Sequence, residues 1–122
     1  MRQFVPLPID SRNGFPQSFP LLFGGKSYRF SLYVNVAADL LPRDGGLLPL
    51  PDERAFVVAR VERAKTDGSF ETILLRKVLP KVEYVAGDIA LRFPEQRVVR
   101  ENLNGRGDFG SLVRGEIADR WA

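Results

Sequence analysis

The chain has no cysteine and no histidine among its 122 residues. Without cysteine it can form neither a disulfide nor a thiolate zinc site, and without histidine it lacks the commonest metal ligand and the commonest general base. No run approaches the ~20 apolar residues that span a bilayer as a helix, and the first residues lack the apolar run of a secretory signal. We therefore expect a protein that is made and folded in a cytoplasm and that is not an enzyme.

Arginine accounts for 14 of the 18 basic residues, although the formal net charge is only +3. The arginines are spread from Arg2 to Arg120, whereas a nucleic-acid surface needs basic residues gathered on one element. Arginine is also enriched at protein–protein interfaces, where its planar guanidinium pairs with carboxylates. The composition therefore favours a protein-binding role. The alternative is a β-barrel that binds single-stranded nucleic acid through Arg29, Tyr33, Arg92 and Phe93.

Most of the carboxylates lie beside glycine or proline, in segments that the sequence predicts as turns. They include Asp10, Asp39, Asp44, Asp52, Glu53, Asp67, Asp88 and Asp108. Solvation of turns explains these residues without acid–base chemistry. The D-x-D-x-D-G spacing of a metal site built from oxygen ligands is also missing. We therefore expect no catalytic residues, no metal and no bound cofactor.

Residues 1–18 contain three prolines and show no sustained hydrophobic period. Proline lacks an N–H donor and holds the preceding residue extended, so this segment is predicted to be an extended N-terminal arm and not a strand of the domain. The arm packs either on its own domain or on a neighbouring subunit. In the second case its apolar residues are interface residues, namely Phe4, Val5, Leu7 and Ile9.

Two hairpins are predicted in the first part of a β domain that spans residues 19–122. Residues 19–23 and 27–36 are joined by a glycine turn, and residues 27–36 alternate strictly between apolar and polar side chains. Such alternation predicts a strand with one buried face. The pair Asp67-Gly68 stands between residues 54–63 and 69–79 and predicts a second antiparallel hairpin.

Four more short strands are predicted at residues 82–85, 89–93, 97–101 and 111–117, with a turn at residues 94–96. No segment shows a convincing helical pattern. Short strands separated by turn signals predict an all-β fold, which is either a small antiparallel β-sandwich or a barrel.

Residues 37–53 predict a long loop that contains three prolines and a Gly-Gly pair. Loops of this length in small domains are often functional, and apolar side chains on a loop indicate a contact surface. The leucines either contact a partner or fold back over the core of the domain. The interface candidates in this loop are Leu47, Leu48 and Leu50.

The stretch N-G-R-G-D-F-G, residues 104–110, contains an R-G-D, a D-F-G and a G-x-G-x-x-G pattern. Dinucleotide binding needs a helix and a second strand after the glycines, for which the chain has no room, and kinase chemistry needs a histidine loop and a longer chain. Nothing else in the sequence indicates an adhesion ligand. We interpret the stretch as a turn in which the glycines allow positive φ, Asp108 accepts hydrogen bonds from local amides and Phe109 holds the loop on the core. The turn residues are Gly105, Gly107, Asp108, Phe109 and Gly110.

Read in order, the β segments resemble the baseplate plug family of contractile-tailed phages, described in cyanophage tails. The family's first strand resembles residues 24–35, G-G-K-S-Y-R-F-S-L-Y-V-N. Its middle hairpin resembles residues 56–62, the D-G turn and residues 73–87, and its closing D-L-G element resembles Asp108-Phe109-Gly110. The chain departs from the family in its long loop and in its only tryptophan, Trp121, which lies at the C-terminus.

This resemblance implies a structural subunit of a phage baseplate that plugs or braces the central hub near the tail tube and spike. Its partners would be the hub, tube and spike proteins, its copies would form a symmetric assembly, and its location would be the virion. An alternative is another small tail component, such as a tube terminator or connector. Besides the arm and loop residues, the interface candidates are Arg120 and Trp121, because an aromatic side chain at a free terminus gains little unless a partner covers it.

Overall fold

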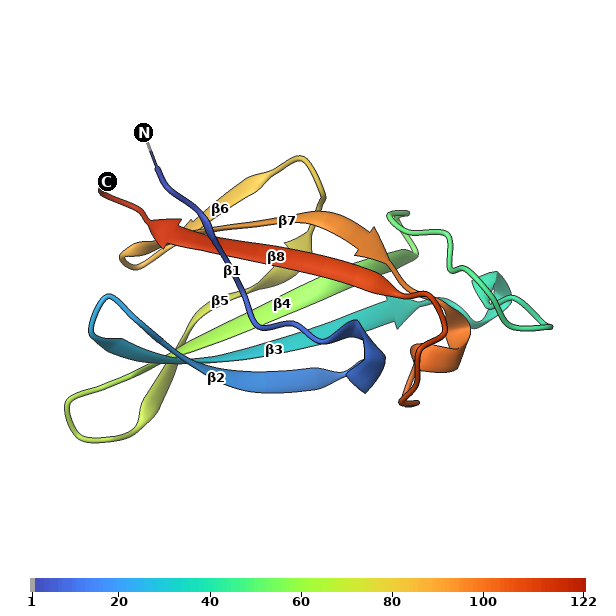
Figure 1. Ribbon diagram of the computed structural model, residues 1–122, viewed down its shortest axis with the longest axis horizontal. Coiled ribbons are helices and arrows are strands. Elements are labelled where there is room, and N and C mark those ends of the chain that lie inside the picture. Colours follow the sequence, from blue (N-terminus) through green and yellow to red (C-terminus); the bar gives the residue numbers. More distant parts are fainter. Residues whose placement is uncertain (1) are drawn as a thin grey trace.

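Two four-stranded antiparallel sheets stack face to face in the computed structural model, which describes residues 2–122 (Figure 1). The first sheet has the strand order β1-β8-β7-β6, and the second has the order β2-β3-β4-β5. The strands are β1 Val5–Pro6, β2 Gln17–Phe23, β3 Lys26–Val36, β4 Ala55–Ala64, β5 Phe70–Val78, β6 Glu83–Ala86, β7 Ile89–Arg97 and β8 Leu112–Asp119. Short 3-10 turns are η1 Ser11–Asn13, η2 Ala38–Leu40 and η3 Arg100–Asn102. The predicted all-β class is confirmed, and the two separate sheets make the fold a sandwich.

The core lies between the sheets and is built from every second residue of the central strands. Strand β3 buries Tyr28, Phe30 and Leu32, and strand β4 buries its odd-numbered residues from 55 to 61. The rings of Phe19 and Phe30 stack with their centroids 5.3 Å apart. This alternation is the pattern that the sequence shows for residues 27–36. In residues 2–122 no helix is long and apolar enough to cross a membrane.

The hairpin between β2 and β3 turns on two glycines. Gly24 and Gly25 have φ values of 58° and 77°, and the two-residue turn that suits twisted strands requires positive φ at both positions. The hairpin between β4 and β5 has Gly68 at φ 87°. Both predicted hairpins therefore form, since their turn residues adopt the required backbone conformation without steric cost.

The predicted turn at residues 94–96 and the predicted strand at residues 97–101 are wrong. Strand β7 continues through Pro94 to Arg97, and its register with β8 shifts between Arg92 and Glu95. This irregularity accommodates Pro94, which has no N–H for the ladder. The chain then forms the 3-10 turn η3 over Arg100–Asn102.

The N-terminal arm lies on its own domain. Val5 pairs with Ile117 of β8, and the N–H of Leu7 donates to the carbonyl oxygen of Gly115 at 2.8 Å. The side chain of Leu7 is only 6% exposed. The arm therefore includes an edge strand of the first sheet, contrary to the expectation of an extended segment outside the sheets. Its last two predicted residues, Gln17 and Ser18, belong to β2.

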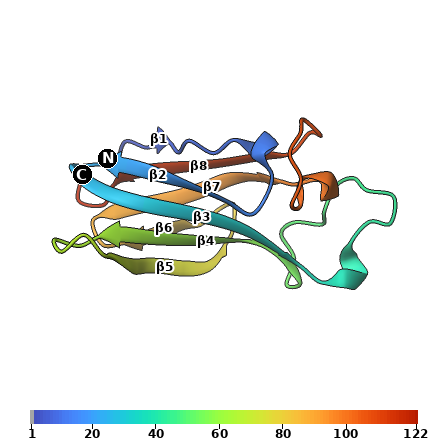
Figure 2. The same cartoon turned by 90° about the horizontal axis from the view of Figure 1, so that it is seen from below.

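The long loop of residues 37–53 covers the end of the sandwich that is opposite to both termini (Figure 2). Leu48 is 2% exposed and its N–H donates to the carbonyl oxygen of Val98 at 2.9 Å. Leu50 is half-buried against the core, whereas Leu47 is 55% exposed. The loop thus contributes to the core and keeps one large apolar side chain on its surface.

Candidate protein interface

Trp121 is a large side chain that is exposed and yet held in position. It is 70% exposed, and its indole Nε1–H donates to Oδ1 of Asp88 at 3.1 Å. Its backbone N–H donates to Oδ1 of Asp119 at 2.9 Å, and the guanidinium carbon of Arg120 lies 4.7 Å from the ring centroid. These contacts orient the ring without covering most of it.

Asp88 connects this C-terminal segment to the second sheet. It lies in the tight turn between β6 and β7, where Gly87 has φ 55°, and its carboxylate forms an ion pair with Lys26 at the start of β3. The hydrogen bond from Lys26, followed by that from the Trp121 indole, lowers the pKa of the Asp88 carboxyl below its ordinary value. Asp88 therefore joins residues of both sheets at this end of the sandwich.

A shallow hollow of about 310 Å³ lies beside the Trp121 ring. It is lined by Trp121 and by residues of the neighbouring turns and strands: Phe23, Gly24, Lys26, Tyr28, Asp88, Ile89 and Asp119. The surface thus combines an aromatic ring, an ion pair and a concave region. A protein side chain can enter such a hollow while its neighbour packs on the indole. We call Trp121, Arg120, Asp88 and Lys26 the Trp121 patch.

Acidification should break the hydrogen bond between Trp121 and Asp88 before the protein unfolds. The pKa of Asp88 is lower in the folded state than its value of about 3.9 in the unfolded chain. The ionised carboxylate therefore stabilises the folded state at pH values above the unfolded pKa, and this stabilisation is lost as the pH falls through the folded pKa. Trp121 is the only tryptophan, so its fluorescence reports the change directly. We expect an emission change with a midpoint below about pH 3.9 while far-ultraviolet circular dichroism stays constant.

Asp88→Asn is the matched control for this titration, since the amide keeps an oxygen acceptor and cannot ionise. We expect the acid transition in Trp121 fluorescence to disappear in this variant. An identical titration in both proteins would assign the transition to another carboxylate.

The structure does not bring the predicted interface residues into one surface. Leu7 and Leu48 lie in the core, and Ile9 and Leu50 are half-buried against it. Phe4 is half-buried, with the guanidinium carbon of Arg92 3.9 Å from its ring centroid. Exposed apolar surface remains at three of the predicted positions: Val5, Leu47 and Trp121. Leu47 belongs to the long loop before β4, and Trp121 follows β8. This loop and the C-terminus lie at opposite ends of the sandwich (Figure 1).

The turn at residues 104–110 is organised by Asn102, which the sequence analysis did not single out. Asn102 is fully buried; its Nδ2 donates to the carbonyl oxygens of Gly105 at 3.2 Å and Gly107 at 3.0 Å, and its Oδ1 accepts from Ser111 Oγ at 2.6 Å. An asparagine among polar and glycine residues is expected on the surface. No local signal distinguishes it, because its hydrogen-bond partners are assembled only by the folded loop.

Two expectations for this turn are wrong. In residues 2–122 no local amide donates to Asp108. The turn is held instead by the side-chain amide of Asn102, which donates to the carbonyl oxygens of Gly105 and Gly107. Phe109 is 49% exposed and lies over Gly107 and not on the core. Of the three turn glycines, Gly107 and Gly110 have positive φ, and so does Asn104 at φ 59°.

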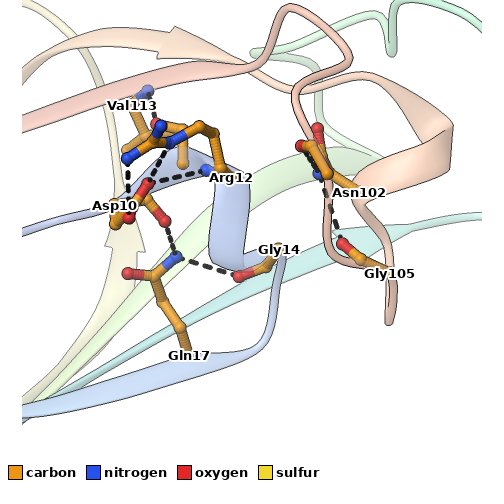
Figure 3. A network of polar contacts seen from close by, with 9 residues as sticks. Asp10, Arg12, Gly14, Gln17, Asn102, Gly105 and Val113 are labelled. Atoms are coloured by element: carbon orange, nitrogen blue, oxygen red, sulfur yellow. Dashed lines mark hydrogen bonds and ion pairs between the residues drawn. The ribbon is translucent and has the colours of Figure 1, made fainter.

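The same turn is bonded to the last part of the arm, and we call this junction the η1–η3 contact. Figure 3 shows polar residues on both of its sides. The N–H of Phe15 donates to the carbonyl oxygen of Asn102 at 2.8 Å, and the N–H of Asn104 donates to that of Phe15 at 2.7 Å. Asp10 accepts from the backbone N–H of Arg12 at 3.0 Å and so caps η1. On the side towards β2, Gln17 Nε2 donates to the carbonyl oxygens of Asp10 and Gly14 (Figure 3).

The residues of the alternative nucleic-acid surface do not share a face. Phe93 is fully buried between the sheets. Arg29 lies on the second sheet and forms two hydrogen bonds with Glu62, at 3.1 and 3.2 Å. Arg92 lies on the first sheet and pairs with Glu116 at 3.0 Å. The arrangement therefore gives no continuous basic and aromatic groove from these residues.

Among the described residues, no group of three or more aspartate or glutamate side chains is placed to hold a metal ion. The groups of the Trp121 patch are an exposed indole ring, two cations and a carboxylate, which can pack, form hydrogen bonds and form ion pairs. No protein family, curated protein or solved structure was found to match this chain.

Proposed function

We propose that this protein is a structural subunit of a contractile phage tail baseplate, located in the virion, which braces the central hub through contacts with tube, hub or spike proteins. The order of its β segments and turns, from the glycine hairpin to the D-F-G turn, supports this assignment through its resemblance to the plug family. The all-β sandwich is compatible with it.

The observation that carries a protein-binding function is the Trp121 patch. Tryptophan and arginine are the residues most enriched at the energetic centres of protein interfaces. Binding immobilises flexible side chains at an entropic cost, and this cost is reduced where contacts such as those from Asp88 and Arg120 already orient the ring. A ring that is held and yet 70% exposed is therefore suited to be covered by a partner.

A bracing role also requires contacts on more than one side. Leu47 is exposed on the long loop, at the end of the sandwich opposite to Trp121. Strands of the two sheets connect these ends, so a force applied at one end is transmitted through a packed core. A subunit with an apolar contact at each end can hold two neighbours at a fixed separation.

Trp121→Ala should weaken assembly much more than folding. Truncating an interface tryptophan typically costs about 2 kcal/mol or more of binding, whereas an exposed residue with few internal contacts changes the free energy of unfolding by less than about 1 kcal/mol. The measurements are binding to purified tube, hub and spike proteins encoded beside the gene, and thermal unfolding. Leu112→Ala, at another exposed apolar position, is the control and should leave binding unchanged.

Three outcomes of this experiment would change the assignment. A chain that stays monomeric and binds none of the tube, hub and spike proteins would contradict the baseplate function. Binding confined to the end of the tail tube would favour a tube terminator. A loss of stability larger than the loss of binding in Trp121→Ala would assign Trp121 to the domain's own structure.

A further inference from the structure

Strand β3 has a free edge at its C-terminal end. Its pairing with β2 begins at Gln17 and Leu32, whereas its pairing with β4 extends to Val36. Residues 33–36 therefore have a neighbouring strand on one side only. The chain before Gln17 does not continue along β3, because Phe15 forms a parallel bridge with Leu103 instead.

The backbone groups of Val34 and Val36 point to this free side. The N–H of Ala37, just after β3, donates to the carbonyl oxygen of Arg54, just before β4. Because hydrogen-bonding residues alternate along an antiparallel pair, the backbone N–H and C=O groups of the odd-numbered residues of β3 point to β4, and those of the even-numbered residues point away from it. The hairpin gives the same assignment, because a two-residue turn makes Phe23 and Lys26 a hydrogen-bonded pair. No hydrogen bond from elsewhere in residues 2–122 reaches the N–H or C=O of either valine.

An open groove of about 510 Å³ lies along this edge. Its walls are formed by Phe15, Pro16, Leu103 and Asn104 on one side and by residues of β3 and β4 on the other, namely Tyr33, Val34, Asn35, Val36 and Val58. The four free residues span roughly 13 Å at the rise of a β-strand. The groove occupies the place that β2 would fill if this strand began several residues before Gln17.

The other edges of the second sheet are protected against strand addition, and this edge is not. The edge of β2 is protected by Pro20. The backbone groups of the residues on either side of Pro20 bond to β3, so an N–H at position 20 would point away from the sheet, and proline has none. The outer edge of β5 carries Lys77, a charge typical of protected edges. Residues 33–36 contain neither proline nor a charged residue.

We propose that this groove binds an extended segment of a partner protein, which adds a short strand beside β3 and pairs its main chain with Val34 and Val36. The wall at Phe15 and Leu103 stops a whole second sheet from approaching this edge, so a second copy of the domain does not fit, whereas a single strand does. The partner segment has apolar side chains at alternate positions, because those on its inner face meet the partly exposed side chains of Val34 and Leu103. This site is separate from the Trp121 patch and does not depend on the function proposed above.

Backbone amide exchange, measured residue by residue by NMR, tests the free edge directly. The amides of Tyr33 and Asn35 bond to β4 and should be protected from exchange. The amides of Val34 and Val36 point to the free side of β3 and should exchange at least about 100-fold faster. Equal protection at all four residues would show that the edge is already occupied and would overturn the proposal.

Peptide binding tests the strand addition. The probe is the peptide acetyl-Lys-Thr-Val-Thr-Val-Thr-amide, titrated to about 1 mM. Two further versions are N-methylated, one at both valines and the other at the first two threonines. A strand pairs through one edge only, so one N-methylated peptide should bind like the parent and the other should not bind. Parent binding should also slow amide exchange at Val34 and Val36. No binding, equal binding of both N-methylated peptides, or protection elsewhere would contradict the proposal.

Val36→Pro removes one free donor of the groove without removing a bond to β4. We expect a folded protein that binds the parent peptide at least about tenfold more weakly, whereas the control Val36→Thr, which keeps the N–H, should bind within about twofold of the original. A folded Val36→Pro protein with unchanged affinity would overturn the proposal. Should the proline variant fail to fold, the amide exchange and the N-methylated peptides decide.

Discussion

Gly14→Ala is expected to lower the free energy of unfolding by about 3–5 kcal/mol. Gly14 has φ 77°, and a Cβ at this position would overlap the carbonyl oxygen of Gly105 and lie 2.8 Å from that of Asn102. Both atoms belong to the backbone, so neither can move aside without breaking the η1–η3 contact. Thermal or urea unfolding measures the change, which corresponds to a fall in Tm on the order of 10 °C or more.

Gly25→Ala is the matched control, because Gly25 has the same φ of 77° and a Cβ there would meet nothing within 4 Å. This variant carries only the cost of placing alanine in the left-handed region, about 1–2 kcal/mol. The difference between the two variants therefore isolates the steric contact at Gly14. Equal losses of stability would show that the loop at residues 102–107 moves freely away from Gly14.

Asn102→Ala is expected to lower the free energy of unfolding by about 2–4 kcal/mol. The substitution removes the amide that bonds the carbonyl oxygens of Gly105 and Gly107 and leaves the Ser111 hydroxyl without its acceptor. It also leaves a void at a fully buried position. Urea unfolding gives the loss of stability, and amide exchange at Val99, whose N–H donates to Ser111 Oγ, gives the local effect.

Asn13→Ala is the control for this substitution, since Asn13 is exposed in η1 and its side chain makes no hydrogen bond in the described part of the chain. It should change the free energy of unfolding by less than about 0.5 kcal/mol. A comparably small effect of Asn102→Ala would mean that water replaces the amide in the turn. The proposed organising role of Asn102 would then be wrong.

The sequence predicts the structure correctly where the cause of the structure is local. Gly24 and Gly25 determine the first hairpin through their own backbone preferences, and the alternation of residues 27–36 determines which side of β3 is buried. These signals lie within a few residues of the structure that they predict. The two hairpins of the second sheet and the all-β class could therefore be derived without a structure.

The sequence does not predict the structure where a partner distant in the sequence decides it. Pro94 looked like a turn residue, but β8 pairs on both sides of it and keeps β7 in one strand. Nothing near Val5 in the sequence indicates its pairing with Ile117, so the sequence predicts an extended arm and not an edge strand. Neither Asn102 nor the groove beside Val34 could be found, because each consists of groups brought together by long-range contacts.

The pairing of the arm with β8 also determines the order in which the chain can fold during synthesis. Strands β2 to β5 are neighbours in sequence and in the second sheet, so they can pair as soon as residues 17–78 have left the ribosome. The first sheet forms later, because β8 is made after the other seven strands and the contact of Ser11 with Val113 spans 102 residues. Closing so long a loop is slow, and until then the apolar inner face of the second sheet is uncovered. The segment from β8 to Trp121 therefore converts a half-exposed sheet into a closed sandwich.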